Sequence, residues 1–270
     1  MDDEQDEVDA QVDALINAEY VKLIQGGIGL CTCQLFKHNI STVTPFASGV
    51  FVILGDNFYL LTASHVIEDW TDSNKLFVPI GEQYVSIAGK GCGTEMNSTE
   101  KIDAAYIKLK PELIPLLVRY YRFLPYQKML HDQKVFDEPN YCVFGYPVIN
   151  KRKDTGKTFG SAYFLRASYD RVYEYYLLDP ISHYALEFVG KAINIQTNKQ
   201  QKIKTEHYGL SGCGLWYIDI GFDEKNETII SDATLIGIMT EFRRGKYDCL
   251  IANRIEIVLS SIVNNERDKL

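Results

Sequence analysis

The sequence predicts an all-β protein, built as a sandwich or a pair of β-barrels, with a helical segment at each end. Three observations support this prediction. The 270-residue chain is 46% hydrophobic, which is ordinary for a protein with a packed core. From about residue 28 onward, short runs rich in Val, Ile, Phe and Tyr alternate with turn residues, a spacing typical of sandwiches and barrels. Helical spacing of apolar residues is found chiefly near the two ends.

The N-terminal segment is strongly acidic. Residues 1–9 contain six acids and no base, so most of the net charge of -8 comes from this segment. Apolar residues then recur at helical spacing over residues 8–24, namely Val8, Val12, Leu15, Ile16 and Tyr20. We therefore expect residues 1–25 to form an acidic tail that leads into an amphipathic helix, which Gly26 and Gly27 end.

The expected strands follow in order, separated by Gly, Asn and Asp. They cover residues 29–36, 49–55, 58–64, 75–81, 84–89, 103–110, 141–148, 162–169, 185–190, 214–220 and 235–242. An apolar stretch at 111–123 interrupts them. The tyrosines of residues 169–178 could form a recognition surface or be strand residues, and strand is the favoured interpretation. The final segment carries Ile255, Val258, Leu259 and Ile262 at helical spacing, so we expect a helix over 253–270.

Composition excludes several classes of function. The basic clusters at 151–153 and 199–204 are small and read as solvated loops, so we expect no nucleic-acid partner. No apolar run could span a bilayer, and the N-terminus lacks a secretory signal, so we expect no membrane partner and a cytoplasmic location with six free cysteines. No CxxC is present, and the string TGKT at 155–158 lacks the first glycine of a phosphate loop. We therefore expect no metal and no cofactor.

Candidate catalytic residues come from three separate segments. Ser211 lies among glycines in GLSGCGLW, residues 209–216, and His65 directly follows an expected strand. Asp103 begins another strand, beside apolar residues. Taken singly, they would be a turn serine, a structural histidine and a strand cap. The chain order His, Asp, Ser excludes an α/β-hydrolase triad on Ser211, because no histidine follows that serine.

Five segments together carry a family resemblance. ASGVFVILG, LLTASHV, IDAAYIKL, GLSGCGLW and LIGIMTE resemble, in this order, the signatures of trypsin-like serine peptidases, nearest to their intracellular bacterial branch, over residues 28–256. The resemblance implies two packed six-stranded β-barrels, a trypsin-like double barrel. The first would cover 26–125 with His65 and Asp103, the second 126–252 with Ser211, and the C-terminal helix 253–270.

The resemblance also implies a role for each site residue. His65 matches the general base, Asp103 the acid that orients it, and Ser211 the nucleophile. The N–H groups of Gly209 and Ser211 match an oxyanion hole, where glycine would leave space for the substrate carbonyl. Thr240 falls where the family has a serine that touches the buried acid and begins the strand that pairs with substrate.

Several positions depart from the family pattern. Secreted members are often activated when a new N-terminus pairs with an aspartate before the nucleophile, but that position is Leu210 here. We therefore expect that activation route to be absent, and the acidic N-terminal segment is a candidate for other control. Val66 replaces a disulfide cysteine, and Cys213 and Gly214 stand where glycine and proline are usual.

The substrate pocket is predicted from the distance to the nucleophile. Its base falls at Thr205 and Glu206, its rim at Tyr208, and its facing strand at Glu241 and Phe242. An acid there would favour a basic substrate residue before the scissile bond.

Two hypotheses of function follow. In the first, the chain is an intracellular serine endopeptidase that cleaves protein or peptide substrates and is narrowly specific or controlled by a regulatory protein partner. In the second, it is a catalytically silent peptide-binding or regulatory module of the same fold, which holds a peptide by strand addition.

Overall fold

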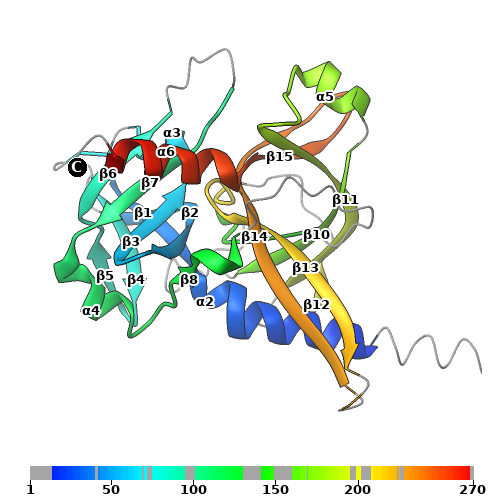
Figure 1. Cartoon of the computed structure of the whole chain (residues 1–270), viewed down its shortest axis with the longest axis horizontal. Helices are drawn as coiled ribbons and strands as arrows, with labels where there is room; N and C mark the ends of the chain where they lie inside the picture. The colour runs from blue at the N-terminus through cyan, green and yellow to red at the C-terminus, as the bar shows by residue number, and fades with distance from the viewer. Residues whose placement is uncertain are drawn as a thin grey trace, which may run out of the picture.

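The computed structural model describes residues 14–39, 42–68, 70–71, 75–94, 101–129, 141–148, 160–168, 170–194, 199–201, 208–223, 225 and 228–267. Two β-sheets lie side by side, with an N-terminal helical segment below them and a C-terminal helix across one side (Figure 1). The predicted all-β architecture with a helix near each end is therefore confirmed.

The first sheet has the strand order β5-β4-β1-β2-β3-β7-β6, and β8 adds to β2 in parallel. Its strands are β1 (Thr32–Asn39), β2 (Thr42–Leu54), β3 (Asn57–Thr62), β4 (Leu76–Ile80), β5 (Gln83–Ser86), β6 (Gly89–Gly93), β7 (Ala105–Leu109) and β8 (Leu124–Pro125). Among the described residues, the outer strands β5 and β6 do not pair with each other. This sheet is therefore curled but open, where the resemblance implied a second closed barrel.

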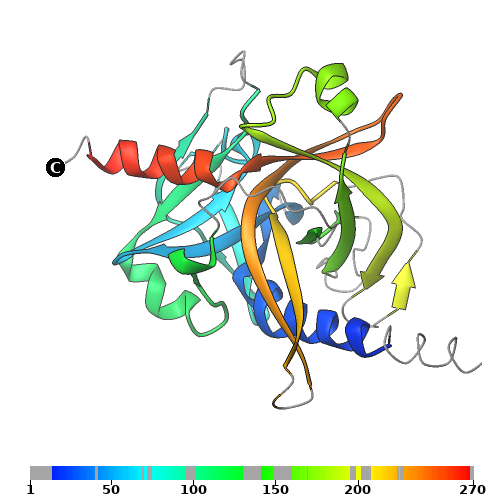
Figure 2. The same ribbon diagram turned by 45° about the vertical axis from the view of Figure 1, so that its right-hand side comes forward.

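The second sheet closes on itself. Its order is β10-β9-β13-β14-β15-β11-β12, and an additional pairing of β10 with β11 completes a six-stranded barrel with β12 outside it (Figure 2). The strands are β9 (Tyr141–Gly145), β10 (Ser161–Ala167), β11 (His183–Asn194), β12 (Lys199–Gln201), β13 (Gly214–Asp223), β14 (Thr228–Arg243) and β15 (Cys249–Arg254). Their inward side chains form an apolar core that includes Val143, Leu165, Leu215 and Leu250.

The N-terminal helical segment extends beyond its predicted end. It runs over residues 14–23, passes through a π-helical turn η1 (Ile24–Ile28), and continues as α2 (Gly29–Cys31). Gly26 and Gly27 therefore do not end it, because the buried side chains of Ile24 and Ile28 on either side hold this turn in the core. Leu15, expected on the apolar face, is exposed.

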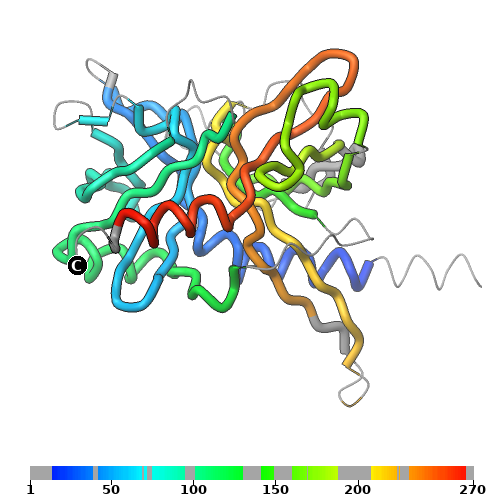
Figure 3. The backbone as a smooth tube through the Cα atoms, turned by 45° about the horizontal axis from the view of Figure 1, so that its top comes forward, coloured from blue at the N-terminus to red at the C-terminus, as the bar shows by residue number. Residues whose placement is uncertain are grey.

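The C-terminal helix α6 (Ile255–Arg267) lies across the first sheet beside the second (Figure 3). The predicted apolar residues Ile255, Val258, Leu259 and Ile262 are all buried. They belong to one core cluster that also contains Val52 and Tyr59 of the first sheet and Phe144, Trp216 and Leu235 of the second. Helix and sheets therefore share a core, which fixes the two halves of the site relative to each other.

Short helices connect several of the described strands, and one of them corrects a prediction. The stretch predicted to interrupt the strands contains η2 (Pro111–Leu113) and α4 (Ile114–Leu117), and η3 (Tyr126–Lys128) follows β8. The tyrosine-rich stretch forms a helix, α5 (Asp170–Tyr176), so the favoured strand interpretation is wrong. Val172 is buried there, and the Tyr173 hydroxyl accepts a hydrogen bond from Ala185 N–H at 2.9 Å, which docks this helix on β11.

Candidate functional site

His65 and Asp103 are brought together by the pairing of two neighbouring strands. His65 lies in the short helix α3 (Ser64–Ile67), directly after β3, and Asp103 lies just before β7. Strands β3 and β7 pair antiparallel with Thr62 opposite Ala105. Because the end of one strand meets the beginning of the other, the residues just beyond this pairing are neighbours.

Both oxygens of Asp103 bind His65. The His65 backbone N–H donates to Oδ1 at 2.9 Å, and His65 Nδ1 lies 2.6 Å from Oδ2. An ionised carboxylate accepts a hydrogen bond from Nδ1–H, so in the neutral imidazole the other ring nitrogen, Nε2, keeps its lone pair. The hydrogen bond that His65 donates to Asp103 raises the pKa of His65; burial opposes this shift, and the nearby charges of Asp103, Glu241 and Glu68 add to it. This pair can therefore hold a proton that His65 takes from another group.

The second barrel holds Asp103 in place. Asn253 on β15 is fully buried, and its Oδ1 accepts the Asp103 backbone N–H at 2.8 Å. His183 on β11 is also buried, and its Nε2 lies 3.2 Å from the Lys101 carbonyl oxygen. The segment that carries the acid is thus positioned by residues far away in the sequence.

Ser211 lies in the turn between residues 208 and 213, and it lines one cleft together with His65 and Asp103. Its hydroxyl donates to the Thr240 carbonyl oxygen at 3.3 Å. Within the part of the chain that the structure describes, no hydrogen bond joins Ser211 Oγ to His65. The Thr240 hydroxyl donates to the Ile251 carbonyl at 3.0 Å, and among the described residues no hydrogen bond joins it to Asp103. Ser211 and His65 therefore line the same cleft, but the described structure has no hydrogen bond between them.

The backbone around Ser211 presents two oriented donors. The Tyr208 carbonyl accepts from Val148 N–H at 2.7 Å, which fixes the peptide whose other end is the Gly209 N–H. The Leu210 carbonyl accepts from Cys213 N–H at 3.0 Å, which fixes the peptide of the Ser211 N–H in the same way. Neither of these N–H groups has an acceptor among the described residues. Two fixed and unpaired donors beside a hydroxyl are what an oxyanion hole requires.

Ser48 on β2 ties this turn to the first sheet. Its hydroxyl donates to the Gly209 carbonyl at 2.7 Å and accepts from Tyr146 N–H at 3.1 Å. Its backbone N–H donates to the Ser211 carbonyl at 2.9 Å. Ser48 is fully buried, so water cannot replace these bonds without a rearrangement.

The backbone conformation and the packing of the turn both require glycine at two positions. Gly209 and Gly212 have φ of +95° and +83°, in the region that favours glycine. A Cβ on Gly209 would lie 2.5 Å from the Tyr146 carbonyl oxygen, and one on Gly212 would collide with Thr62 and the Ser48 carbonyl. These glycines therefore allow the turn to pack closely against the protein's own chain.

Leu210 anchors the turn in the core of the second barrel. Its side chain is 1% exposed and packs in the core of the second barrel. It occupies apolar surroundings, where a carboxylate would lose its hydration. The turn is thus held by burial of a leucine, with no ion pair from this position.

This cleft is a cavity of about 980 Å³, and the residues that line it include His65, Asp103, Gly209, Ser211 and Thr240. The predicted pocket residues Tyr208, Glu241 and Phe242 also line it, and Tyr208 is 74% exposed. Glu241 forms an ion pair with Arg243 at 2.8 Å. The predicted pocket base, Thr205 and Glu206, lies outside the described residues.

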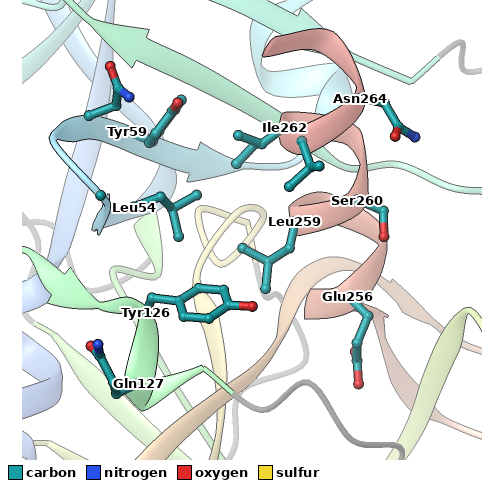
Figure 4. Close-up of a pocket in the computed structure, with 12 residues that line it drawn as sticks. Leu54, Tyr59, Tyr126, Gln127, Glu256, Leu259, Ser260, Ile262 and Asn264 are labelled. Atoms are coloured by element: carbon teal, nitrogen blue, oxygen red, sulfur yellow. The ribbon is translucent and has the colours of Figure 1, made fainter. Parts of the chain in front are cut away.

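A second cavity of about 760 Å³ lies between α6, the turn after β2, and η3. Leu54, Tyr59, Leu259 and Ile262 surround it, with Tyr126 at its edge (Figure 4). The described residues that line it include no histidine, so it offers no imidazole base of the kind that His65 provides. Among the described residues, no group of three or more His, Cys, Asp or Glu side chains could hold a metal ion. The cleft with Ser211 is therefore the stronger candidate.

Sequence reasoning did not find Ser48, Asn253 or Val148. Ser48 lies in the segment ASGVFVILG, but nothing in that segment marks it as a site residue, and Asn253 and Val148 lie in none of the five segments. Each acts on the site across more than 50 residues of sequence, as with the 161 residues between Ser48 and Gly209. Only the three-dimensional pairing of the two halves shows their contacts.

Comparison with known proteins supports the fold. No model of a protein family and no curated sequence matches the chain. Among solved structures, granzyme C (GrC) shares a TM-score of 0.55 at 13% identity, with 87% of this chain and 93% of that chain covered. A scabies mite inactivated protease paralogue shares a TM-score of 0.57 at 12% identity, with 89% and 96% covered. At this identity the likeness shows the trypsin-like fold alone, and the expected bacterial branch has no sequence match to support it.

Proposed function

We propose that the chain is a serine endopeptidase that acts through Ser211, His65 and Asp103. One observation carries the proposal: a single cleft brings together the groups of a serine peptidase. It is lined by the Ser211 hydroxyl, by His65 and Asp103, which two hydrogen bonds join, and by the turn that holds the unpaired N–H groups of Gly209 and Ser211. A serine hydroxyl becomes nucleophilic when a neighbouring imidazole removes its proton. The cleft contains the groups needed for both the attack and the charge that it creates.

In the proposed mechanism, Ser211 Oγ first exchanges its bond to the Thr240 carbonyl for one to His65 Nε2. Attack on the scissile carbonyl forms the C–O bond, transfers the hydroxyl proton to Nε2, and places a negative charge on the carbonyl oxygen. The Gly209 and Ser211 N–H groups stabilise that charge. Asp103 stabilises the imidazolium, which then protonates the leaving amine as the C–N bond breaks. Water, deprotonated by His65, hydrolyses the resulting ester on Ser211.

We also propose that the enzyme works inside the cell and is narrowly specific or partner-controlled. All six cysteines are free thiols in the structure, which suits a reducing compartment. Among the described residues, no helix is long and apolar enough to cross a membrane. The Ser211 hydroxyl donates to Thr240, so binding of a substrate or a partner protein would have to form its hydrogen bond to His65.

The second candidate is a catalytically silent peptide-binding module. The bond from Ser211 Oγ to the Thr240 carbonyl favours it, because this hydroxyl is not aimed at a base. One structural neighbour is itself described as an inactivated protease paralogue. The intact set of His65, Asp103 and Ser211 argues against this candidate.

A cleavage assay separates the two candidates. The purified chain and its Ser211→Ala variant are incubated with a complex peptide pool, and new termini are identified by mass spectrometry. An endopeptidase produces recurrent cleavage sites that are lost in Ser211→Ala and in His65→Ala. Equal peptide patterns with and without Ser211, together with retained peptide binding, would favour the silent module.

A further inference from the structure

The candidate cleft contains an open strand edge next to Ser211. Pairing between β14 and β13 ends at Ile238 opposite Gly214, whereas pairing between β14 and β15 continues to Arg243 opposite Cys249. Among the described residues, no strand pairs with Glu241 and Arg243 on their other side. An extended peptide can add to such an edge through backbone hydrogen bonds.

The charged residues that line the cleft include more cations than anions. Of the described residues that line the cavity, Lys101, Arg243 and Arg244 are cationic, and Asp103 and Glu241 are anionic. Asp103 is bound to His65, and Glu241 is bound to Arg243 at 2.8 Å. Both carboxylates are thus already engaged, and the expected attraction of Glu241 for a basic substrate residue is offset by its partner.

Lys101 and Arg244 keep their charge available. Lys101 Nζ donates to the Tyr176 carbonyl oxygen at 2.8 Å, which is a neutral acceptor. The Arg244 guanidinium lies 5.7 Å from the ring centre of Phe242. No carboxylate of a described residue forms an ion pair with either side chain.

Lys101 is also held in an unusual backbone conformation. Its φ is +54°, a region that non-glycine residues seldom adopt. Its carbonyl oxygen lies 3.2 Å from Nε2 of the buried His183, and its ammonium group reaches α5. The fold therefore fixes this cation at the rim of the cleft from two directions, and strained residues of this kind concentrate at functional sites.

We infer that the cleft selects substrates with an acidic side chain two to four residues from the scissile bond, bound between Lys101 and Arg244. That the bound peptide is a substrate rests on the proposed peptidase function. The selectivity itself rests on the open strand edge and on the charges that line the cleft. Arg244 follows Thr240 by four residues, roughly 13 Å along an extended strand, which sets the spacing from Ser211. The carboxylate of a glutamate or aspartate would form ion pairs with these two cations.

Binding to the Ser211→Ala variant tests the selectivity without requiring catalysis. Labelled peptide pools of equal length carry Glu, Gln or Lys at alternate positions, with the other positions mixed, and fluorescence anisotropy gives the dissociation constant of each pool. Since ion pairs at exposed sites are weak, we expect Glu pools to bind about three- to tenfold more tightly than Gln pools, and Lys pools most weakly. The difference should shrink at high ionic strength.

A charge reversal identifies the residues responsible. In the Ser211→Ala background, Arg244→Glu should bind Lys pools at least as tightly as Glu pools. Arg119→Glu makes the same charge change at an exposed residue outside the cavity and should keep the preference for Glu. Equal binding of the three pools, no binding of any pool, or a preference unaffected by Arg244→Glu would overturn the inference.

The same pools given to the unaltered chain separate this inference from the proposed function. Cleavage without a preference for acidic pools would overturn the inference and leave the peptidase proposal intact. Acid-selective binding without any cleavage would support the inference for a silent peptide-binding module and count against the peptidase.

Discussion

Replacing Ser48 by alanine should weaken both the fold and the candidate oxyanion hole. The change removes the donor to the Gly209 carbonyl, at 2.7 Å, and the acceptor of the Tyr146 N–H, at 3.1 Å. Ser48 is 0% exposed, so both groups lose their partner in a dry site. An unsatisfied buried polar group costs about 1 to 3 kcal/mol, so Ser48→Ala should lower the free energy of unfolding by roughly 2 to 6 kcal/mol.

The effect on the site is measured separately. Urea unfolding gives the stability, and the rate of reaction with a fluorophosphonate probe reports the oriented donors beside Ser211. Loss of one oxyanion donor costs about 100- to 1000-fold in related enzymes, and a loosened donor should cost less, so we expect labelling to slow by roughly 10- to 100-fold.

A control variant distinguishes a local effect from general destabilisation. Thr32 is also buried, and its hydroxyl donates to the Ile28 carbonyl at 2.8 Å and not to a group of the Ser211 turn. Thr32→Val should lower stability without slowing the labelling of Ser211. Ser48→Ala with a stability change below about 1 kcal/mol, or with an unchanged labelling rate, would refute the role assigned to Ser48.

Three further predictions follow from the same geometry. His65 must be neutral to act as a base and its pKa is raised, so kcat/KM should fall as pH decreases through a value above about 6.5; a pH profile with its acid limb at or below 6.5 would contradict this. Asp103→Asn removes the largest cause of the raised pKa, so that limb should move to lower pH while kcat falls by roughly 10,000-fold, as steady-state kinetics would show. Leu210→Ala should cost about 2 to 5 kcal/mol in urea unfolding, because a fully buried side chain is truncated, and a loss below 1 kcal/mol would show that the turn is not anchored there.

The strand pattern and terminal helices could be predicted because burial determines them locally. In β4 (Leu76–Ile80), buried and half-buried residues alternate, and in α6 the apolar residues follow one helical face. The failures occur where tertiary contacts override local preference. The tyrosine-rich segment forms the helix α5 because Val172 and Tyr173 dock on the second barrel, although tyrosine favours strands.

The site was predictable only as a set of residue types. The sequence placed His65 after one expected strand and Asp103 at the beginning of another, and the structure brings His65 Nδ1 within 2.6 Å of Asp103 Oδ2. The pairing of Glu241 with Arg243 depends on side-chain conformation, and the bond from Asn253 to Asp103 depends on how two sheets pack. Sequence order contains neither kind of information, which explains why the expected preference for a basic substrate could not be judged in advance.

The central claim is that Ser211 is an activated nucleophile in an assembled cleft. The most direct measurement is to treat the purified chain with a fluorophosphonate probe and locate the adduct by peptide mass spectrometry. We expect a single adduct on Ser211, absent from Ser211→Ala and strongly reduced in His65→Ala. Labelling that is undetectable, or equal with and without His65, would contradict the account.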